Sequence, residues 1–153
     1  MKVDTLTLFL KLDKIYNKIL GESDMISDNE KKGTILLVDD SVLSLSITKN
    51  MLKDEYEVFT VQSGKGALKI LLEKKLIPDL IILDIAMPNM NGWQLFNLIK
   101  AMHSLQEKPI AFLTALDTQE DIRQAREIGA ADYITKPCEK PELLKRAKAM
   151  IGR

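Results

Sequence analysis

Three aspartates of this 153-residue chain directly follow apolar segments of the kind that form buried strands. Asp39 and Asp40 follow residues 34–38, and Asp84 follows residues 80–83. The second segment is wholly apolar and lies between a proline and a loop of proline, asparagine and glycine, so it predicts a central strand buried on both faces. Ligands of open α/β sheets bind beyond the carboxyl ends of the strands. The three carboxylates are therefore candidate site residues, although turn formation or helix capping would also explain each one alone.

Two more polar side chains occupy equivalent places: Thr114 follows residues 109–113, and Lys136 follows residues 131–135. Right-handed crossovers would bring all these strand ends to one edge of a parallel sheet. Carboxylates gathered there would repel one another unless a cation lay among them, and Mg²⁺ prefers such oxygen ligands. The Thr114 hydroxyl, the Lys136 ammonium and a backbone N–H near Ala115 would suit the oxygens of a phosphoryl group attached to one carboxylate. Together these residue types predict a phosphoryl acceptor.

Strands and helices alternate beyond residue 33. Apolar runs and turn residues predict strands at residues 34–38, 56–61, 80–83, 109–113 and 131–135. Amphipathic spacing predicts helices at residues 41–52, 63–75, 93–102 and 141–151, and one from Asp117 or Thr118 to Gly129, with Val42 and Leu72 among the residues expected in the core. Such alternation is typical of a parallel sheet with helices on both faces.

The first residues form a separate amphipathic segment. Phe9, Leu12, Tyr16 and Ile19 are spaced three and four residues apart, which predicts a helix over residues 5–20. The polar residues that follow predict a linker, so we divide the chain into residues 1–32, a helix and linker, and 33–153, the main domain. The helix covers only about two heptads, so self-association through it and docking onto the main domain both stay open.

Composition excludes several classes of protein. The 22 basic and 22 acidic residues cancel, so no overall field attracts nucleic acid or an anionic membrane. The single cysteine, Cys138, excludes an internal disulfide and fits a reducing compartment. We find neither a signal peptide nor an apolar run of the roughly 20 residues that span a bilayer. We therefore expect a cytoplasmic protein without direct nucleic-acid or membrane partners.

The combined motifs resemble the receiver domain of two-component response regulators. The resemblance covers residues 33 to 153 and rests on five groups of residues: Asp39-Asp40, Asp84 with Met87-Pro88 and Gly92, Thr114-Ala115, Tyr133, and Lys136-Pro137. It implies a doubly wound, flavodoxin-like α/β fold whose five parallel strands lie in the order 2-1-3-4-5, here with an extra N-terminal helix.

The resemblance also implies a chemistry. Asp84 would accept a phosphoryl group from a phosphohistidine of a sensor histidine kinase or phosphotransfer protein. The metal would be Mg²⁺, bound by Asp40, Asp84 and the backbone carbonyl of Ala86, with Asp39 acting mainly through a metal-bound water. The phosphoryl oxygens would be bound by Thr114, Ala115 and Lys136, with the Lys136-Pro137 peptide bond in the cis form.

A conformational switch would follow from phosphorylation. By the same resemblance, Thr114 would move toward the phosphoryl group and Tyr133 would turn inward. The change would be read by a protein target at the face made by the fourth helix, fifth strand and fifth helix of the main domain. We expect no DNA-binding output domain, and no enzyme activity beyond the protein's part in its own phosphorylation and dephosphorylation.

Three other classes of protein share parts of this pattern. A phosphatase or phosphotransferase of the haloacid dehalogenase type also uses an aspartate nucleophile and Mg²⁺, but it carries an acid two residues later, where this chain has Ala86. A flavodoxin-type electron carrier would need a phosphate-binding loop after the first strand, which the sequence lacks. A degenerate receiver that binds a partner constitutively would not need the acids, the hydroxyl and the lysine that are all retained here.

Overall fold

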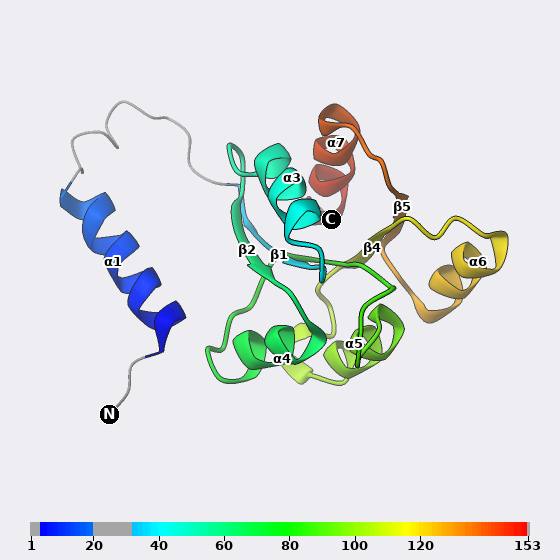
Figure 1. Ribbon diagram of the computed structural model, residues 1–153, viewed down its shortest axis with the longest axis horizontal. Coiled ribbons are helices and arrows are strands. Elements are labelled where there is room, and N and C mark those ends of the chain that lie inside the picture. Colours follow the sequence, from blue (N-terminus) through cyan, green and yellow to red (C-terminus); the bar gives the residue numbers. More distant parts are fainter. Residues whose placement is uncertain (1–3, 20–31, 153) are drawn as a thin grey trace. The chain divides into compact units, whose positions relative to one another are not determined.

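A computed structural model describes residues 4–19 and 32–152, and these fall into two units (Figure 1). The first holds a single helix, α1 (Thr5–Ile19), which begins where the Asp4 carboxylate accepts a hydrogen bond from the backbone N–H of Thr7 at 2.7 Å. The helix predicted over residues 5–20 is therefore present up to Ile19. The predicted linker falls almost wholly on residues 20–31, outside the described residues.

The second unit is one parallel sheet with helices between the strands. The strands pair in the order β2-β1-β3-β4-β5, which confirms the predicted doubly wound topology. In chain order the elements are β1 (Thr34–Val38), α3 (Val42–Leu52), β2 (Glu57–Val61), α4 (Gly64–Leu72), β3 (Leu80–Leu83), α5 (Gly92–Lys100), the 3-10 turn η1 (His103–Leu105), β4 (Ile110–Thr114), α6 (Gln119–Ile128), β5 (Asp132–Thr135) and α7 (Lys140–Ile151).

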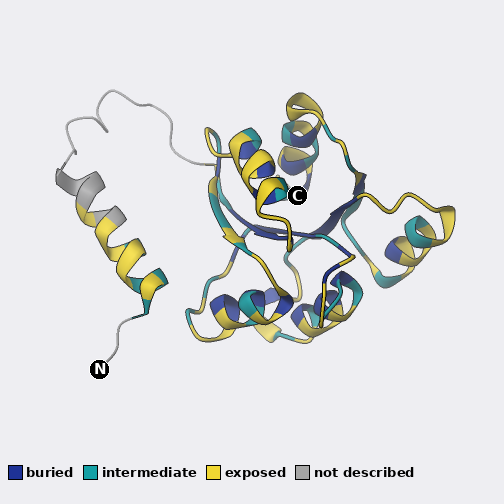
Figure 2. Ribbon diagram, in the orientation of Figure 1, coloured by how far each residue is buried: buried dark blue, intermediate teal, exposed yellow. Residues whose placement is uncertain are grey.

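Helices cover both faces of this sheet. Helices α3 and α7 lie on one face, and α4 and α5 lie on the other (Figure 1). Alternate strand residues face opposite ways, so Ile35 and Leu37 of β1 join the core cluster under α3 and α7, together with Leu80 and Ile82 of β3. All residues of β3 and β4 are buried, and Figure 2 shows the sheet as a dark layer between the helices. Coverage on both faces explains why the sequence of β3 is apolar without alternation.

Helix boundaries follow side-chain caps. Ser41, Ser63 and Thr118 each accept a hydrogen bond from a backbone N–H in the first turn of α3, α4 and α6. Gly129 ends α6 at φ +90°, the left-handed conformation that glycine adopts without strain. These four residues stand where the sequence predicted the helices to begin or end.

Two core predictions were wrong. Val42 is 63% exposed, because it is the first residue of α3 and lies at the sheet edge, where β1 has already ended. Leu72 is 59% exposed at the last position of α4, and Ile70 is buried in its place beside Ala67 and Leu71. Helix α4 also ends three residues earlier than predicted.

Within residues 4–19 and 32–152, no helix combines the length and the apolar character that crossing a bilayer requires.

Candidate functional site

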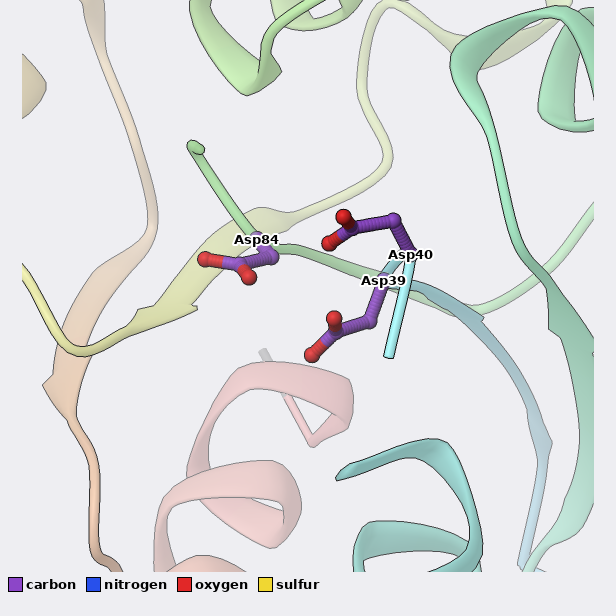
Figure 3. Close-up of side chains that lie close together, drawn as sticks. All are labelled: Asp39, Asp40 and Asp84. Atoms are coloured by element: carbon purple, nitrogen blue, oxygen red, sulfur yellow. The ribbon is translucent and has the colours of Figure 1, made fainter. Parts of the chain in front are cut away.

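The three aspartates meet at the carboxyl end of the sheet. Val38 of β1 pairs with Leu83 of β3, which places Asp39 and Asp84 side by side just beyond the two strands. The backbone N–H of Asp84 donates to the Val38 carbonyl at 2.8 Å and holds this register. Asp40 follows Asp39 at the start of the loop to α3, and carboxylate oxygens of all three residues lie within 4.8 Å of one another (Figure 3).

Among the residues that the structure describes, only Lys136 has an ammonium group within ion-pair distance of these carboxylates. Its backbone N–H donates to the Thr114 carbonyl at 2.8 Å, which extends the pairing of β4 and β5 by one residue, and the Lys136-Pro137 peptide bond is cis. The Nζ atom lies 2.6 Å from Asp39 Oδ2 and 3.5 Å from Asp84 Oδ2. In this structure the ammonium is therefore bound more closely to Asp39 than to Asp84.

The two buried carboxyls differ in their proton affinity. Burial raises the pKa of Asp84, and it outweighs the Lys136 charge and the Thr114 hydroxyl, which act to lower it. Burial also acts to raise the pKa of Asp39, but hydrogen bonds from Lys136 and the Ser41 backbone N–H, with a contribution from Ser44, lower it overall. The Ser41 bond to Asp39 Oδ1 measures 2.9 Å. Asp39 is thus the better compensated anion, and the charge of Asp84 is compensated less completely.

We expect Asp84→Asn to stabilise the metal-free protein at neutral pH by about 0.5–2 kcal/mol, because it removes this poorly compensated charge. Because the pKa of Asp84 is higher in the folded than in the unfolded chain, folding favours its protonated form. The contribution of this carboxyl to stability is therefore present below the unfolded pKa and is lost as pH rises through the folded pKa. The gain should therefore shrink in acid. Urea unfolding with EDTA at neutral pH and at about pH 3.5 measures both effects. An equal gain at both pH values would contradict this explanation.

The lowered pKa of Asp39 has the opposite linkage. Its contribution to stability is present above the unfolded pKa and is lost as pH falls through the folded pKa.

The aspartate cluster fits a hard divalent cation. Mg²⁺ binds oxygen ligands at about 2.0–2.1 Å, so two ligand oxygens on one ion lie up to about 4.2 Å apart. The carboxylate oxygens here lie within 4.8 Å, a spacing that small side-chain rotations can close. The low exposure of the Asp39 and Asp84 carboxylates, 9% and 12%, favours a bound cation, because buried like charges are otherwise unfavourable.

The hydroxyl group of Thr114 closes one side of the site. Thr114 is the last residue of β4 and is 1% exposed, and its Oγ1 accepts a 3.3 Å hydrogen bond from the backbone N–H of Leu116. Ala115 follows it in the exposed loop between β4 and α6. Ala86 is likewise exposed, two residues after Asp84. The structure thus gathers the predicted residue types around Asp84.

Tyr133 connects this loop to β5. Its hydroxyl donates to the backbone carbonyl of Leu116 at 2.6 Å, and its ring lies 6.2 Å from that of Phe112. Burial, followed by the charges of nearby aspartates, raises the pKa of Tyr133 to about 12, so the hydroxyl keeps its proton at neutral pH. The sequence analysis missed Leu116, since a backbone acceptor leaves no signature in residue type.

The loop that follows Asp84 forms a turn that is closed at Gly92. The backbone N–H of Gly92 donates to the Ile85 carbonyl at 2.8 Å. A Cβ atom at Gly92 would collide with the Asp84 carbonyl oxygen and lie 2.8 Å from Ile85 Cα. Asn91 and Gln94 then form a reciprocal capping box that starts α5, a feature that the sequence analysis did not identify.

Comparisons with known proteins identify the family of the unit that contains the sheet. The family model described as response regulator receiver domain matches residues 35–148. A Vibrio cholerae protein named "Probable cyclic di-GMP phosphodiesterase" is 39% identical over 113 residues, which cover 74% of this chain and 25% of that protein. The heme response regulator HssR of Staphylococcus aureus is 40% identical over 119 residues, which cover 77% of this chain and 51% of HssR. The chain thus spans from a quarter to half of the length of these curated relatives.

The fold has solved counterparts as well. The chemotaxis protein CheY4 of Vibrio cholerae superposes with a TM-score of 0.71 at 30% sequence identity. The match covers 76% of this chain and 97% of the CheY4 chain, so it takes in nearly all of that protein.

Proposed function

Because the chain belongs to the response regulator receiver domain family, we propose that it is a phosphorylation-dependent switch whose phosphoryl acceptor is Asp84. The observation that carries the proposal is the convergence of Asp39, Asp40 and Lys136 on the Asp84 carboxylate at the sheet edge. Among these carboxyls, Asp84 stands at the end of the central strand β3 and lacks a closely bound cation of its own.

The proposed transfer is a substitution at phosphorus. One carboxylate oxygen of Asp84 forms a bond to phosphorus as the bond from phosphorus to the donor's histidine nitrogen breaks. The leaving imidazole takes the electrons of that bond and then a proton. Lys136 Nζ, 3.5 Å from Asp84 Oδ2, is near enough to bind an oxygen of the transferred group. Thr114 and the backbone N–H of Ala115 would bind the others.

Asp39, Asp40 and Asp84 would hold the metal, with the backbone carbonyl of Ala86 as a further ligand. Bound Mg²⁺ would supply positive charge beside the phosphoryl oxygens. The protein's own part is to hold the Asp84 carboxylate fixed, through β3 and the Gly92 turn, and to exclude bulk water from its buried side. We place the protein among signalling proteins rather than enzymes, since the group transferred stays on the protein until it is hydrolysed.

The switch would act through Thr114 and Tyr133. Both are linked to Leu116, Thr114 by accepting from its N–H and Tyr133 by donating to its carbonyl. A movement of the Thr114 hydroxyl toward a phosphoryl group would therefore break the first link and shift the loop that Tyr133 holds. We propose that this repacks the face made by α6, β5 and α7, where a protein target binds.

Tyr133→Phe should separate phosphorylation from signalling. The variant loses the hydrogen bond to Leu116, worth about 1 kcal/mol, so the loop should open about fivefold more often. Amide exchange at Leu116 and its neighbours should quicken by that factor, whereas the rate of phosphorylation should change little because the Tyr133 hydroxyl bonds to the Leu116 carbonyl and not to an aspartate of the cluster. Unchanged exchange in the variant would rule out this role for the hydroxyl.

The upstream and downstream partners follow from the same proposal. The donor would be a sensor histidine kinase or a phosphotransfer protein in the cytoplasm. The output would be a protein contact rather than direct binding of nucleic acid. The phosphodiesterase named among the relatives shares only this segment, so its activity is not carried over to the chain.

The direct test is transfer from a phosphohistidine protein labelled with radioactive phosphate. The label should move to the wild-type chain in Mg²⁺, and it should fail to move to Asp84→Asn or in EDTA. Asp54→Asn is a matched control, because the Asp54 side chain is 72% exposed and lies outside the aspartate cluster, in an ion pair with Lys140 that measures 3.7 Å. Transfer to Asp84→Asn at the wild-type rate would overturn the assignment of the acceptor.

A further inference from the structure

Helix α1 presents a wide apolar side with large exposed residues. Leu8, Phe9, Leu12 and Ile15 are 50%, 61%, 55% and 53% exposed. Leu8, Leu12 and Ile15 follow one another at helical spacing and so form one stripe, with Phe9 beside it. Large apolar side chains exposed together on one helix mark a surface that binds a partner. The nature of that partner has to be read from the polar residues of the same helix.

The polar residues of α1 include a line of lysines. Lys11, Lys14 and Lys18 are spaced three and four residues apart in the sequence, so these positions follow one another at the helical repeat of α1. Asp13 is the only acidic residue between Thr5 and Ile19, although acidic and basic residues balance over the whole chain. The positive charge of α1 is therefore local, and the balanced charge of the whole chain conceals it.

We propose that α1 binds the surface of an anionic lipid bilayer and lies in its plane. An apolar stripe bordered by lysines is the pattern of helices that bury one side among acyl chains while their ammonium groups reach lipid phosphates. The 15 residues of α1 span about 22 Å, less than the roughly 30 Å of the hydrocarbon core, so the helix is suited to lie on a bilayer. The expectation that no membrane is bound rested on the net charge of the whole chain and on the absence of a segment long enough to span a bilayer, and neither criterion detects a short helix that lies on the surface.

A second copy of α1 fits the pattern less well. Two helices of this length would meet over about two heptads, whereas a coiled coil recognisable from sequence has three or four. Pairing would also gather the lysines of both copies in one short bundle with few acids to oppose them. An anionic lipid surface supplies the missing negative charge and covers the apolar side at the same time.

Co-sedimentation of the full chain with lipid vesicles tests the proposal. The chain should bind vesicles in which about a third of the phosphatidylcholine is replaced by phosphatidylglycerol, and it should bind pure phosphatidylcholine weakly. Leu12→Asp should abolish binding. Lys11→Gln and Lys14→Gln should each weaken binding about fivefold, and added salt should weaken it further. Leu98→Asp is the matched control, because Leu98 is 44% exposed on α5 and should leave binding unchanged.

Two kinds of result would contradict binding of α1 to an anionic bilayer. No binding to anionic vesicles, or equal binding by the wild type and Leu12→Asp, would overturn the proposal. A wild-type dimer in light scattering that Leu12→Asp dissociates, without vesicle binding, would assign the apolar side to a second copy instead. Thermal unfolding should be the same for both proteins, since Leu12 lies outside the unit that contains the sheet.

Discussion

Replacing Lys136 by alanine is expected to strengthen Mg²⁺ binding while slowing phosphorylation roughly 10²-fold. The two effects have one cause. The Lys136 ammonium lies 2.6 Å from Asp39 Oδ2 and 3.5 Å from Asp84 Oδ2, so it competes with a cation for the same carboxylates in the unphosphorylated protein. During transfer the same ammonium would stabilise charge on the phosphoryl oxygens, and the variant lacks it.

Two measurements separate these effects. A Mg²⁺ titration followed by the fluorescence of Trp93, whose ring lies 4.8 Å from that of Phe112 beyond the Asp84 loop, gives the affinity. Intact mass against time with acetyl phosphate gives the rate. Lys140→Ala is the control, since Lys140 is a half-exposed lysine that pairs with Asp54 at 3.7 Å. Weaker Mg²⁺ binding together with an unchanged rate in Lys136→Ala would contradict the role given to this lysine.

Gly92→Ala is expected to destabilise the fold by about 2–3 kcal/mol and to slow phosphorylation with it. The added methyl group would collide with the backbone carbonyl of Asp84 and crowd Ile85 Cα at 2.8 Å. Neither is the mobile end of a side chain, so the loop itself must move and the Asp84 carboxylate must move with it. Urea unfolding and the rate of mass gain with acetyl phosphate measure the two consequences.

Gly129→Ala supplies the comparison. No atom lies within 4 Å of a Cβ atom built at Gly129, whose φ of +90° leaves only a conformational cost of about 1 kcal/mol. That variant should lose stability but keep the wild-type rate of phosphorylation. If both variants were less stable than the wild type and both were phosphorylated at the wild-type rate, the Gly92 contact would have no part in positioning Asp84.

The sequence predicted which side chains meet at the sheet edge, because those residues directly follow the strands or end them. A short, wholly apolar segment between a proline and a turn-rich loop, such as Leu80–Leu83, favours a buried strand, and the residue after that strand then lies at the sheet edge. The same reasoning placed Asp39 and Thr114 correctly. Side chains that follow strands directly are positioned by the sheet, and the sheet follows from local pattern.

What the sequence did not predict depends on contacts between distant segments. The Tyr133 hydroxyl bonds to a carbonyl 17 residues away in the chain, and any residue type could have supplied that acceptor. The preference of Lys136 for Asp39 over Asp84 is a difference between 2.6 and 3.5 Å, which no motif encodes. Val42 illustrates a further limit, because helical spacing does not reveal where a helix extends past the sheet beneath it.

The most direct test of phosphorylation at Asp84 is intact mass after incubation with Mg²⁺ and acetyl phosphate, for the wild type and Asp84→Asn side by side. We expect that the wild-type chain gains the mass of one phosphoryl group, that EDTA prevents the gain, and that Asp84→Asn shows none. A gain of the same size in Asp84→Asn would place the phosphoryl group elsewhere. Absence of any gain in a wild-type chain that binds Mg²⁺ and accepts no phosphoryl group from a phosphohistidine donor would contradict the proposed switch.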